Sequence, residues 1–179
     1  MTQNNQNYTI MQIDRNKYNP VEHDSFRALT VKQPYAENLV TPAYKDEDGI
    51  IYGVKTIEVR SKRTQYRGDL LICSSASPGL SGMRSGVTLG FVELYDIKPI
   101  EEFTEEDWEN TRIPKEKREK ITHGYGWLMR NPRRVIEYPI KGQLGIYNLY
   151  YTKGEIMKYP QIVELDKAGW EQIQKGVKK

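Results

Sequence analysis

Three side chains capable of acid–base and electrostatic chemistry stand close together in this sequence. Lys55, Glu58 and Arg60 fall within the segment 53–61, which reads GVKTIEVRS. A carboxylate can accept hydrogen bonds from an amine, and an ammonium or guanidinium can hold a phosphate or stabilise a developing negative charge. A lysine that is crowded by an arginine and partly desolvated also loses its proton more readily, so that it can act as a base.

The element that carries these side chains is predicted to be a strand over 54–60, because β-branched and charged residues alternate there. Both faces of this strand carry charge. Either the three charged groups satisfy one another in a pocket, since buried charge is costly unless it is paired, or the strand lies at a sheet edge with its charges in solvent. Taken alone, the pattern favours the solvated edge, because charged side chains are usually exposed.

The rest of the chain is predicted to fold as short strands with a few short helices. A hairpin is expected around Asp48-Gly49, a helix opened by Pro34, an acidic helix capped by Thr104 and Asp107, and a C-terminal helix capped by Asp166. The predicted strands are 8–13, 26–31, 70–73, 87–97, 124–130, 134–138 and 145–150, and two of the predicted helices are 34–40 and 114–120. This pattern is typical of an α+β domain built on a small, closed or nearly closed β-barrel of about six strands with short flanking helices.

The length and composition of the chain indicate one domain of ordinary size and a cellular compartment. The chain has 179 residues and a mean hydropathy of −0.74, with no run near the ~18 apolar residues of a membrane span. The single cysteine, Cys73, excludes an internal disulfide, lies in an apolar run and is expected to be a buried thiol. We therefore expect a cytoplasmic protein without membrane partner, cofactor or metal. We expect a polar N-terminal extension (1–24), a central domain (25–150) and a C-terminal extension with a short helix (151–179).

Several segments of the chain together resemble the ASCH domain family. They read ALTVKQPYA at 28–36, GxKTxExRS at 53–61, YRGDLLI at 66–72, LGFVEL at 89–94, YGW at 125–127 and PIKGQLGIY at 139–147. The resemblance covers about residues 26–150, and residues 43–52 look like an insertion. It implies a PUA-like β-barrel with a ligand cleft beside the GxKxxExR strand, in a family generally taken to bind RNA or nucleotides.

The resemblance also implies an activity for some members. Certain bacterial members hydrolyse the acetyl amide of N4-acetylcytidine with a lysine and a threonine of this motif and a later glutamate. The lysine matches Lys55, whereas Glu58 stands at the position of the threonine, and Glu93 is the candidate for the later glutamate. The chain therefore lacks the hydroxyl nucleophile that the activity uses.

With this resemblance, the balance shifts toward a ligand cleft lined by Lys55, Glu58 and Arg60. Glu58 is expected to accept hydrogen bonds from the exocyclic amine of a base, and Lys55 and Arg60 to hold a phosphate or a carbonyl oxygen. The other candidates each have a structural alternative. They are Gln33 (base edge or helix cap), Tyr35 (stacking or core), Trp127 (core before stacking), Ser74 and Ser75 (phosphate contact or loop), and Arg63 and Arg67 (phosphate contact or solvated surface).

Two classes of function follow. The preferred one is a binding module for RNA or a nucleotide, in which the cleft holds a splayed base. The alternative is an amidohydrolase acting on an N4-acylated cytidine or another modified nucleoside, with Lys55 as base or activator and Glu58 in proton transfer. A weaker third idea is a protein-interaction adaptor that uses the acidic segment 101–109. The presence of Glu58 in place of a hydroxyl favours the binding module.

Overall fold

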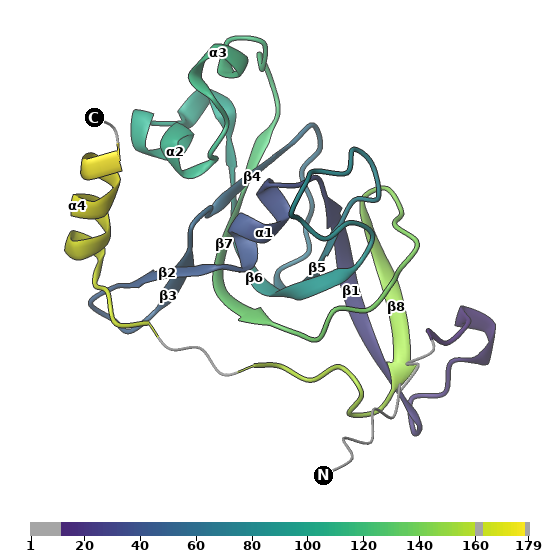
Figure 1. The fold of residues 1–179 in the computed structure, drawn as a ribbon. Coiled ribbons are helices and arrows are strands. Elements are labelled where there is room, and N and C mark those ends of the chain that lie inside the picture. Colours follow the sequence, from purple (N-terminus) through teal and green to yellow (C-terminus); the bar gives the residue numbers. More distant parts are fainter. Residues whose placement is uncertain (1–11, 160–162, 178–179) are drawn as a thin grey trace.

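The computed structural model describes residues 12–159 and 163–177 and confirms a mixed α+β fold (Figure 1). The strands are β1 (His23–Val31), β2 (Pro42–Lys45), β3 (Ile51–Gly53), β4 (Ile57–Arg60), β5 (Gly68–Ser74), β6 (Thr88–Pro99), β7 (Tyr125–Arg134) and β8 (Ile146–Thr152). The helices are η1 (Arg15–Lys17), α1 (Tyr35–Val40), η2 (Ile100–Glu102), α2 (Glu105–Asn110), α3 (Lys115–Arg118) and α4 (Lys167–Val177).

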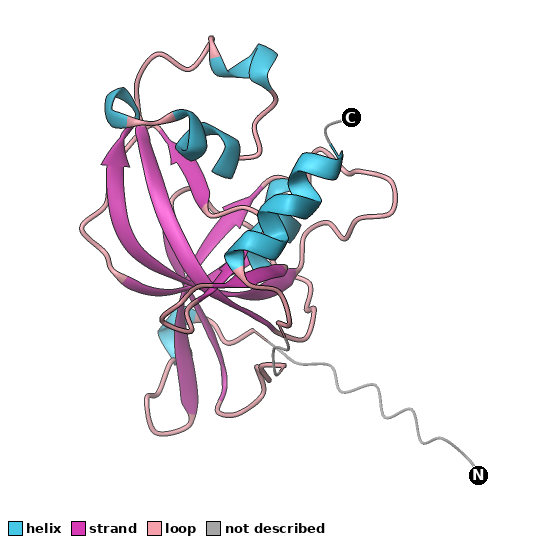
Figure 2. Ribbon diagram, turned by 90° about the vertical axis from the view of Figure 1, so that its left-hand side faces the viewer, coloured by secondary structure: helices cyan, strands magenta, loops and turns pink. Residues whose placement is uncertain are grey.

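Six strands form one sheet in the order β4-β7-β6-β5-β1-β8, and β2 and β3 form a separate hairpin. β1 and β5 run parallel, and the other neighbours are antiparallel. The sheet curves strongly, and α2 and α3 lie beyond one end of it (Figures 1 and 2). Its outer strands β4 and β8 do not pair within the described residues, so the sheet is open and the closed form of the predicted barrel is not confirmed.

The central strand β5 is buried on both faces, because apolar residues fill both sides of it. Leu70 and Ile72 pack in one cluster with Leu39 and Val40 of α1, while Leu71 and Cys73 pack on the other face. The second cluster also contains three side chains of β8, which are Tyr147, Leu149 and Tyr151. Burial raises the pKa of the Cys73 thiol to about 12, so the buried, unreactive thiol expected from the sequence is confirmed.

Several predicted elements are confirmed with small changes. The hairpin turns at Asp48-Gly49, where the backbone N–H groups of Asp48 and Ile50 donate to Asp46 Oδ1. Thr104 and Asp107 form a reciprocal capping box at the start of α2. The N–H of Gly169 donates to Asp166 Oδ1 at 2.8 Å, as expected of an N-cap of α4. Predicted helix 114–120 is the shorter α3.

Two strand predictions were wrong. The strand predicted over 54–60 begins only at Ile57, because the N–H groups of residues 54–56 donate to Thr41, to Asn38 of α1 and to Asn110 after α2 instead of to a neighbouring strand. The strand predicted at 124–130 is longer, because β7 continues past a bulge at Asn131, a residue in the left-handed region at φ 56°, and ends at Arg134. The separate strand predicted at 134–138 is absent, since only its first residue belongs to β7. Beyond β7, Val135 makes an isolated bridge to Lys158. Residues 8–11 of the predicted strand 8–13 lie outside the described residues.

Gly53, the first residue of the charged segment, lets α1 approach the chain before β4. A Cβ at this position would lie 2.7 Å from the carbonyl oxygen of Leu39 and 3.1 Å from that of Asn38. The same Asn38 carbonyl accepts a hydrogen bond from the N–H of Lys55 at 3.0 Å. A glycine is therefore needed here because backbone meets backbone, and the contact fixes where Lys55 leaves the chain.

We predict that Gly53→Ala lowers the free energy of unfolding by about 1–3 kcal/mol, because the new methyl group meets carbonyl oxygens that belong to α1. Urea unfolding followed by circular dichroism measures this. Gly79→Ala is the matched control, because a Cβ there meets its nearest heavy atom at an ordinary 3.6 Å. Equal midpoints for the wild type and Gly53→Ala would contradict the close approach.

Candidate functional site

The ammonium group of Lys55 is buried at the centre of the site. The side chain is 1% exposed. Its Nζ donates to the carbonyl oxygens of Ile57 at 2.7 Å and Thr111 at 2.6 Å, and it lies 3.3 Å from Glu58 Oε2. The ring of Tyr35 covers it, with 4.9 Å from Nζ to the ring centroid. Two hydrogen bonds, an ion pair and a cation–π contact thus replace the water that the ammonium has lost.

Burial and the neighbouring carboxylate act on this lysine in opposite directions. Burial lowers the pKa of Lys55, and Glu58 partly opposes this by favouring the charged form. The proton therefore leaves Lys55 more readily than it leaves an exposed lysine. Because the folded state binds this proton more weakly than the unfolded chain, Lys55 makes stability rise as the pH rises between its folded pKa and its usual value.

Glu58 and Arg60 complete the charged cluster at the edge of the sheet. Glu58 Oε1 lies 3.6 Å from Arg60 Nε, and Arg60 Nη2 donates to the carbonyl oxygen of Thr30 at 2.9 Å. Their side chains are 13% and 27% exposed. β4 is an edge strand, yet its charges pair in a pocket, so the structure selects the pocket over the solvated edge that the pattern alone favours.

This cluster is incompletely satisfied. Glu58 Oε2 and Arg60 Nε are both out of contact with solvent and have no hydrogen-bond partner. Each unsatisfied polar group of this kind costs about 1–3 kcal/mol. Such groups are rare in native structures and call for an explanation. Here both atoms face a charged neighbour inside the cluster, since Glu58 Oε2 lies 3.3 Å from Lys55 Nζ and Arg60 Nε lies 3.6 Å from Glu58 Oε1. The partly exposed side chains of Glu58 and Arg60 reach the surface at the same place.

That place is a groove of about 430 Å³ beside β4. It is formed by the end of β1, the start of α1, β4 itself and two loops, one after β5 and one before β8. The lining residues are Thr30, Val31, Lys32, Tyr35, Glu58, Val59, Arg60, Ser61, Ser75, Gln143 and Leu144. The walls combine apolar side chains with two cations and one anion, and the rim residue Leu144 is fully exposed at 100%.

Four of the residues singled out from the sequence meet in this groove: Tyr35, Glu58, Arg60 and Ser75. Lys55 lies behind them and does not line it. The ring of Tyr35 lines the groove and also packs against the core. The Ser75 hydroxyl donates to the carbonyl oxygen of Ser77 at 2.7 Å.

Three predicted ligand contacts lie away from the groove lining and have their polar groups bonded internally. Gln33 is 4% exposed, and its Oε1 accepts from the N–H of Glu37, so the structure shows the helix cap and not a free amide. The Ser74 hydroxyl bonds to the backbone of Val87. Trp127 is a core residue whose Nε1 donates to the carbonyl oxygen of Lys62 at 3.0 Å.

The remaining candidates lie outside the groove as well. Glu93 makes a two-pronged ion pair with Arg130 and is not among the residues that line the groove, so nothing here places it as the later glutamate. Arg63 lies over the ring of Tyr125, at 5.6 Å from its centroid. Arg67 Nη1 donates to the carbonyls of Thr64 and Tyr66.

Other residues of the site were missed by the sequence analysis. Lys32, Gln143 and Leu144 line the groove, and all three fall inside the segments that carry the family resemblance, which was the available signal. Thr111, whose carbonyl accepts from Lys55, gave no signal in the sequence. It contributes only a backbone atom, and it lies 56 residues after Lys55 in the chain.

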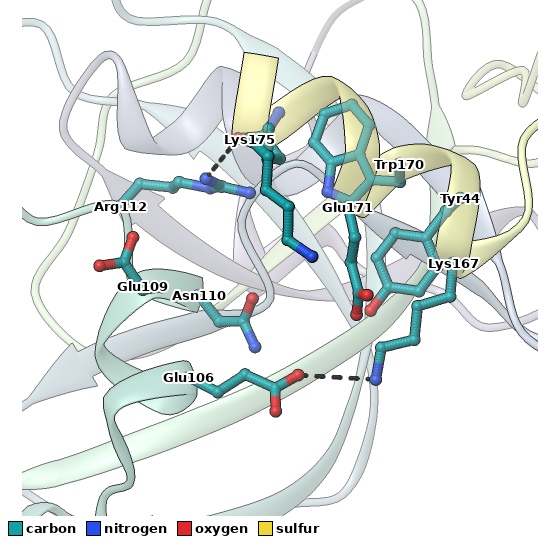
Figure 3. Close-up of a pocket in the computed structure, with 10 residues that line it drawn as sticks. Tyr44, Glu106, Glu109, Asn110, Arg112, Lys167, Trp170, Glu171 and Lys175 are labelled. Atoms are coloured by element: carbon teal, nitrogen blue, oxygen red, sulfur yellow. Dashed lines mark hydrogen bonds and ion pairs between the residues drawn. The ribbon is translucent and has the colours of Figure 1, made fainter. Parts of the chain in front are cut away.

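A second hollow, of about 210 Å³, lies between α2 and α4 (Figure 3). Its charged side chains balance, with three carboxylates against three cations. The lining residues are Tyr44, Glu106, Glu109, Asn110, Arg112, Lys167, Trp170, Glu171, Gln174 and Lys175. In residues 12–159 and 163–177, no group of His, Cys, Asp and Glu side chains is arranged to hold a metal ion.

The open α+β sheet with a buried lysine beside an edge-strand groove defines the class of domain. The sequence profile of the ASCH domain family matches residues 47–148, which is more than half of the chain, so the chain belongs to the ASCH domain family. A search of curated proteins found no match. No helix among the described residues is long and apolar enough to cross a lipid bilayer.

We predict that Lys55→Met lowers the free energy of unfolding by about 3–5 kcal/mol, because it removes the ammonium that faces the largely buried Glu58 Oε2. The double variant Lys55→Met/Glu58→Gln should lose less stability than the two single variants lose together. The difference, which is the coupling energy of the pair, should be about 0.5–3 kcal/mol. Chemical denaturation of the four proteins measures the cycle.

The ion pair between Lys115 and Glu105 is the control, because its side chains are 75% and 73% exposed. The same cycle at that pair should give a coupling of about 0–1 kcal/mol. If the Lys55 pair couples no more strongly than the exposed pair, the buried ammonium does not depend on Glu58.

Proposed function

We propose that the groove beside β4 binds a nucleobase of single-stranded RNA or of a nucleotide. The observation that supports this most is the pair of Glu58 and Arg60, whose carboxylate and guanidinium lie side by side in the lining of the groove. A bound group with a donor next to an acceptor would satisfy both side chains at once. The ASCH domain family is consistent with RNA binding.

Nucleobases fit this requirement because their Watson–Crick edges place hydrogen-bond donors beside acceptors, and proteins read splayed bases on those edges. A carboxylate accepts from the exocyclic amine of a base, as it does from cytosine N4 in DNA recognition. A guanidinium donates to a neighbouring ring nitrogen or carbonyl. Tyr35 supplies an aromatic ring in the same groove for stacking. The volume of about 430 Å³ lies within the usual range of ligand pockets.

Charge beside the groove supports a polymer over a free base. Lys32 lines the rim, and the chain runs from Arg60 and Ser61 of the groove straight into Lys62, Arg63 and Arg67. No ion pair with another described residue is formed by the four cations beside Arg60, which are Lys32, Lys62, Arg63 and Arg67. Arg63 also stacks on Tyr125. Unpaired cations and partly exposed aromatic rings beside a base site suit a phosphate backbone and its flanking bases.

Hydrolysis of an N4-acylated cytidine is the second candidate, and the lowered pKa of Lys55 beside Glu58 is the observation in its favour. In this reaction Glu58 would take a proton from a water that attacks the acyl carbon. The C–N bond would then break, the proton would pass to the leaving N4 amine, and the acid and cytidine would leave. Lys55 would act only through Glu58, because it does not line the groove.

For the binding function, we predict that Glu58→Gln and Arg60→Gln each weaken the binding of a fluorescein-labelled single-stranded RNA by about 10- to 150-fold, since hydrogen bonds to charged groups are worth about 1.5–3 kcal/mol. Fluorescence anisotropy gives the dissociation constants. Arg130→Gln is the control, because this arginine pairs with Glu93 and lies outside the groove. Its affinity should equal that of the wild type.

The same titrations at several salt concentrations test the phosphate contacts. We predict that affinity falls with salt and that Arg63→Gln reduces the slope of log K against log salt by about 0.7. An affinity that does not change with salt would rule out the RNA backbone as part of the ligand.

For the hydrolase, we predict no release of acetate from N4-acetylcytidine, because the hydroxyl nucleophile is replaced by Glu58 and Lys55 stays out of the groove. Mass spectrometry of the nucleoside after incubation with wild type and with Lys55→Met measures this. Release by the wild type that is lost in Lys55→Met would overturn the preference for binding and make this protein an amidohydrolase.

A further inference from the structure

We propose that the C-terminal helix α4 belongs to the functional unit and that Arg112 is the positioning residue through which α4 holds Lys55 and the groove in place. The helix lies outside the residues that match the ASCH domain family, which end at 148. It nevertheless contacts the turn that supplies an acceptor to the buried ammonium. The proposal concerns the geometry of Lys55, and only its binding consequence rests on the function proposed above.

The first link is a clasp between two short segments, 110–112 after α2 and 54–56 before β4. The N–H of Thr56 donates to the carbonyl of Asn110 at 3.1 Å. Lys55 Nζ donates to the carbonyl of Thr111 at 2.6 Å, and Arg112 Nε donates to the carbonyl of Val54 at 2.6 Å. Consecutive residues on one side therefore bond to consecutive residues on the other, and the bond to the ammonium lies in the middle.

The clasp is held in an unusual backbone conformation. Arg112 has a φ of 60°, in the left-handed region that a residue with a long side chain rarely adopts. Such a conformation persists only where the surroundings fix it. The Thr111 hydroxyl helps, since it donates to the carbonyl of Trp108 and accepts from the N–H of Ile113. The Arg112 side chain supplies the rest of the restraint from outside the turn.

The second link joins Arg112 to α4. Its Nη1 donates to Gln174 Oε1 at 3.0 Å, and its guanidinium lies 6.0 Å from the ring centroid of Trp170 (Figure 3). Lys167, at the start of the same helix, pairs with Glu106 of α2 at 3.5 Å. The Arg112 guanidinium thus donates through Nε to Val54, the neighbour of Lys55, and through Nη1 to α4.

The seat of α4 is mostly polar. None of the side chains from Lys167 to Gly176 is fully buried, and the hollow of about 210 Å³ remains between α4 and α2. Because the helix has no fully buried side chain over this range, the loss of its bond to Arg112 is expected to loosen it. Loosening α4 frees the guanidinium, relaxes the turn and withdraws the Thr111 carbonyl from Lys55. The ammonium then depends more strongly on its ion pair with Glu58, which lines the groove.

The experiment compares two glutamines of the same helix. Gln174→Ala removes the acceptor of Arg112, whereas Gln172→Ala is the matched control, because Gln172 is exposed and has no contact with Arg112. Trp170→Ala is a second, stronger disruption. Lysine-selective ¹⁵N NMR follows the Lys55 Nζ resonance, which is assigned by its absence in Lys55→Met. Fluorescence anisotropy with the labelled single-stranded RNA follows the groove.

We expect Gln174→Ala and Trp170→Ala to move the Lys55 Nζ resonance and to weaken RNA binding by about 2- to 30-fold, while Gln172→Ala changes neither. The unfolding midpoint of the sheet is measured in parallel, so that a loss of the whole fold is recognised. A merely stabilising helix would lower that midpoint without moving the resonance in the folded protein.

Two outcomes would overturn parts of the account separately. An unmoved Lys55 resonance in both Gln174→Ala and Trp170→Ala would sink the positioning role of Arg112, whatever happens to RNA binding. A wild-type protein that binds no RNA would sink the proposed function, yet a resonance moved by Gln174→Ala would still establish the link from α4 to Lys55.

Discussion

The compensation of one buried ammonium is the constraint on which the rest of the site depends. An uncompensated charge in this place would cost several kcal/mol, so each contact around Lys55 has an energetic reason. Two backbone carbonyls, the Glu58 carboxylate and the Tyr35 ring together replace its water. These groups come from three separate parts of the chain. The ammonium therefore fixes how α1, β4 and the turn after α2 sit against one another.

The same constraint explains the spacing of the charged segment. Gly53 lets the backbone of α1 come close, and that backbone orients Lys55. Glu58 stands three residues on, where it can neutralise the ammonium on its inner side and reach the groove on its outer side. Arg60 then balances the outer side of Glu58. The groove thus displays a carboxylate and a guanidinium whose positions are set from behind, which is the preorganisation that a specific polar ligand needs.

The sequence predicted what depends on local pattern and missed what depends on distant contacts. The α+β class, the capping box at Thr104 and the buried thiol of Cys73 follow from spacing and composition, and the structure confirms them. The start of the strand at Ile57 could not be predicted, because backbone hydrogen bonds to the distant residues Asn38, Thr41 and Asn110 override the β-propensity of 54–56. Likewise, the backbone carbonyl of Thr111 that accepts from Lys55 carries no signature in the sequence.

The central claim is that the groove beside β4 receives a base of single-stranded RNA. The most direct measurement is chemical-shift mapping in a ¹H–¹⁵N NMR titration with a short single-stranded RNA, including the Arg60 Nε–H, which makes no hydrogen bond in the structure. The account predicts that the largest changes occur at this group and at Tyr35, Glu58 and Ser61. Changes confined to the hollow between α2 and α4, or a titration without any changes, would contradict it.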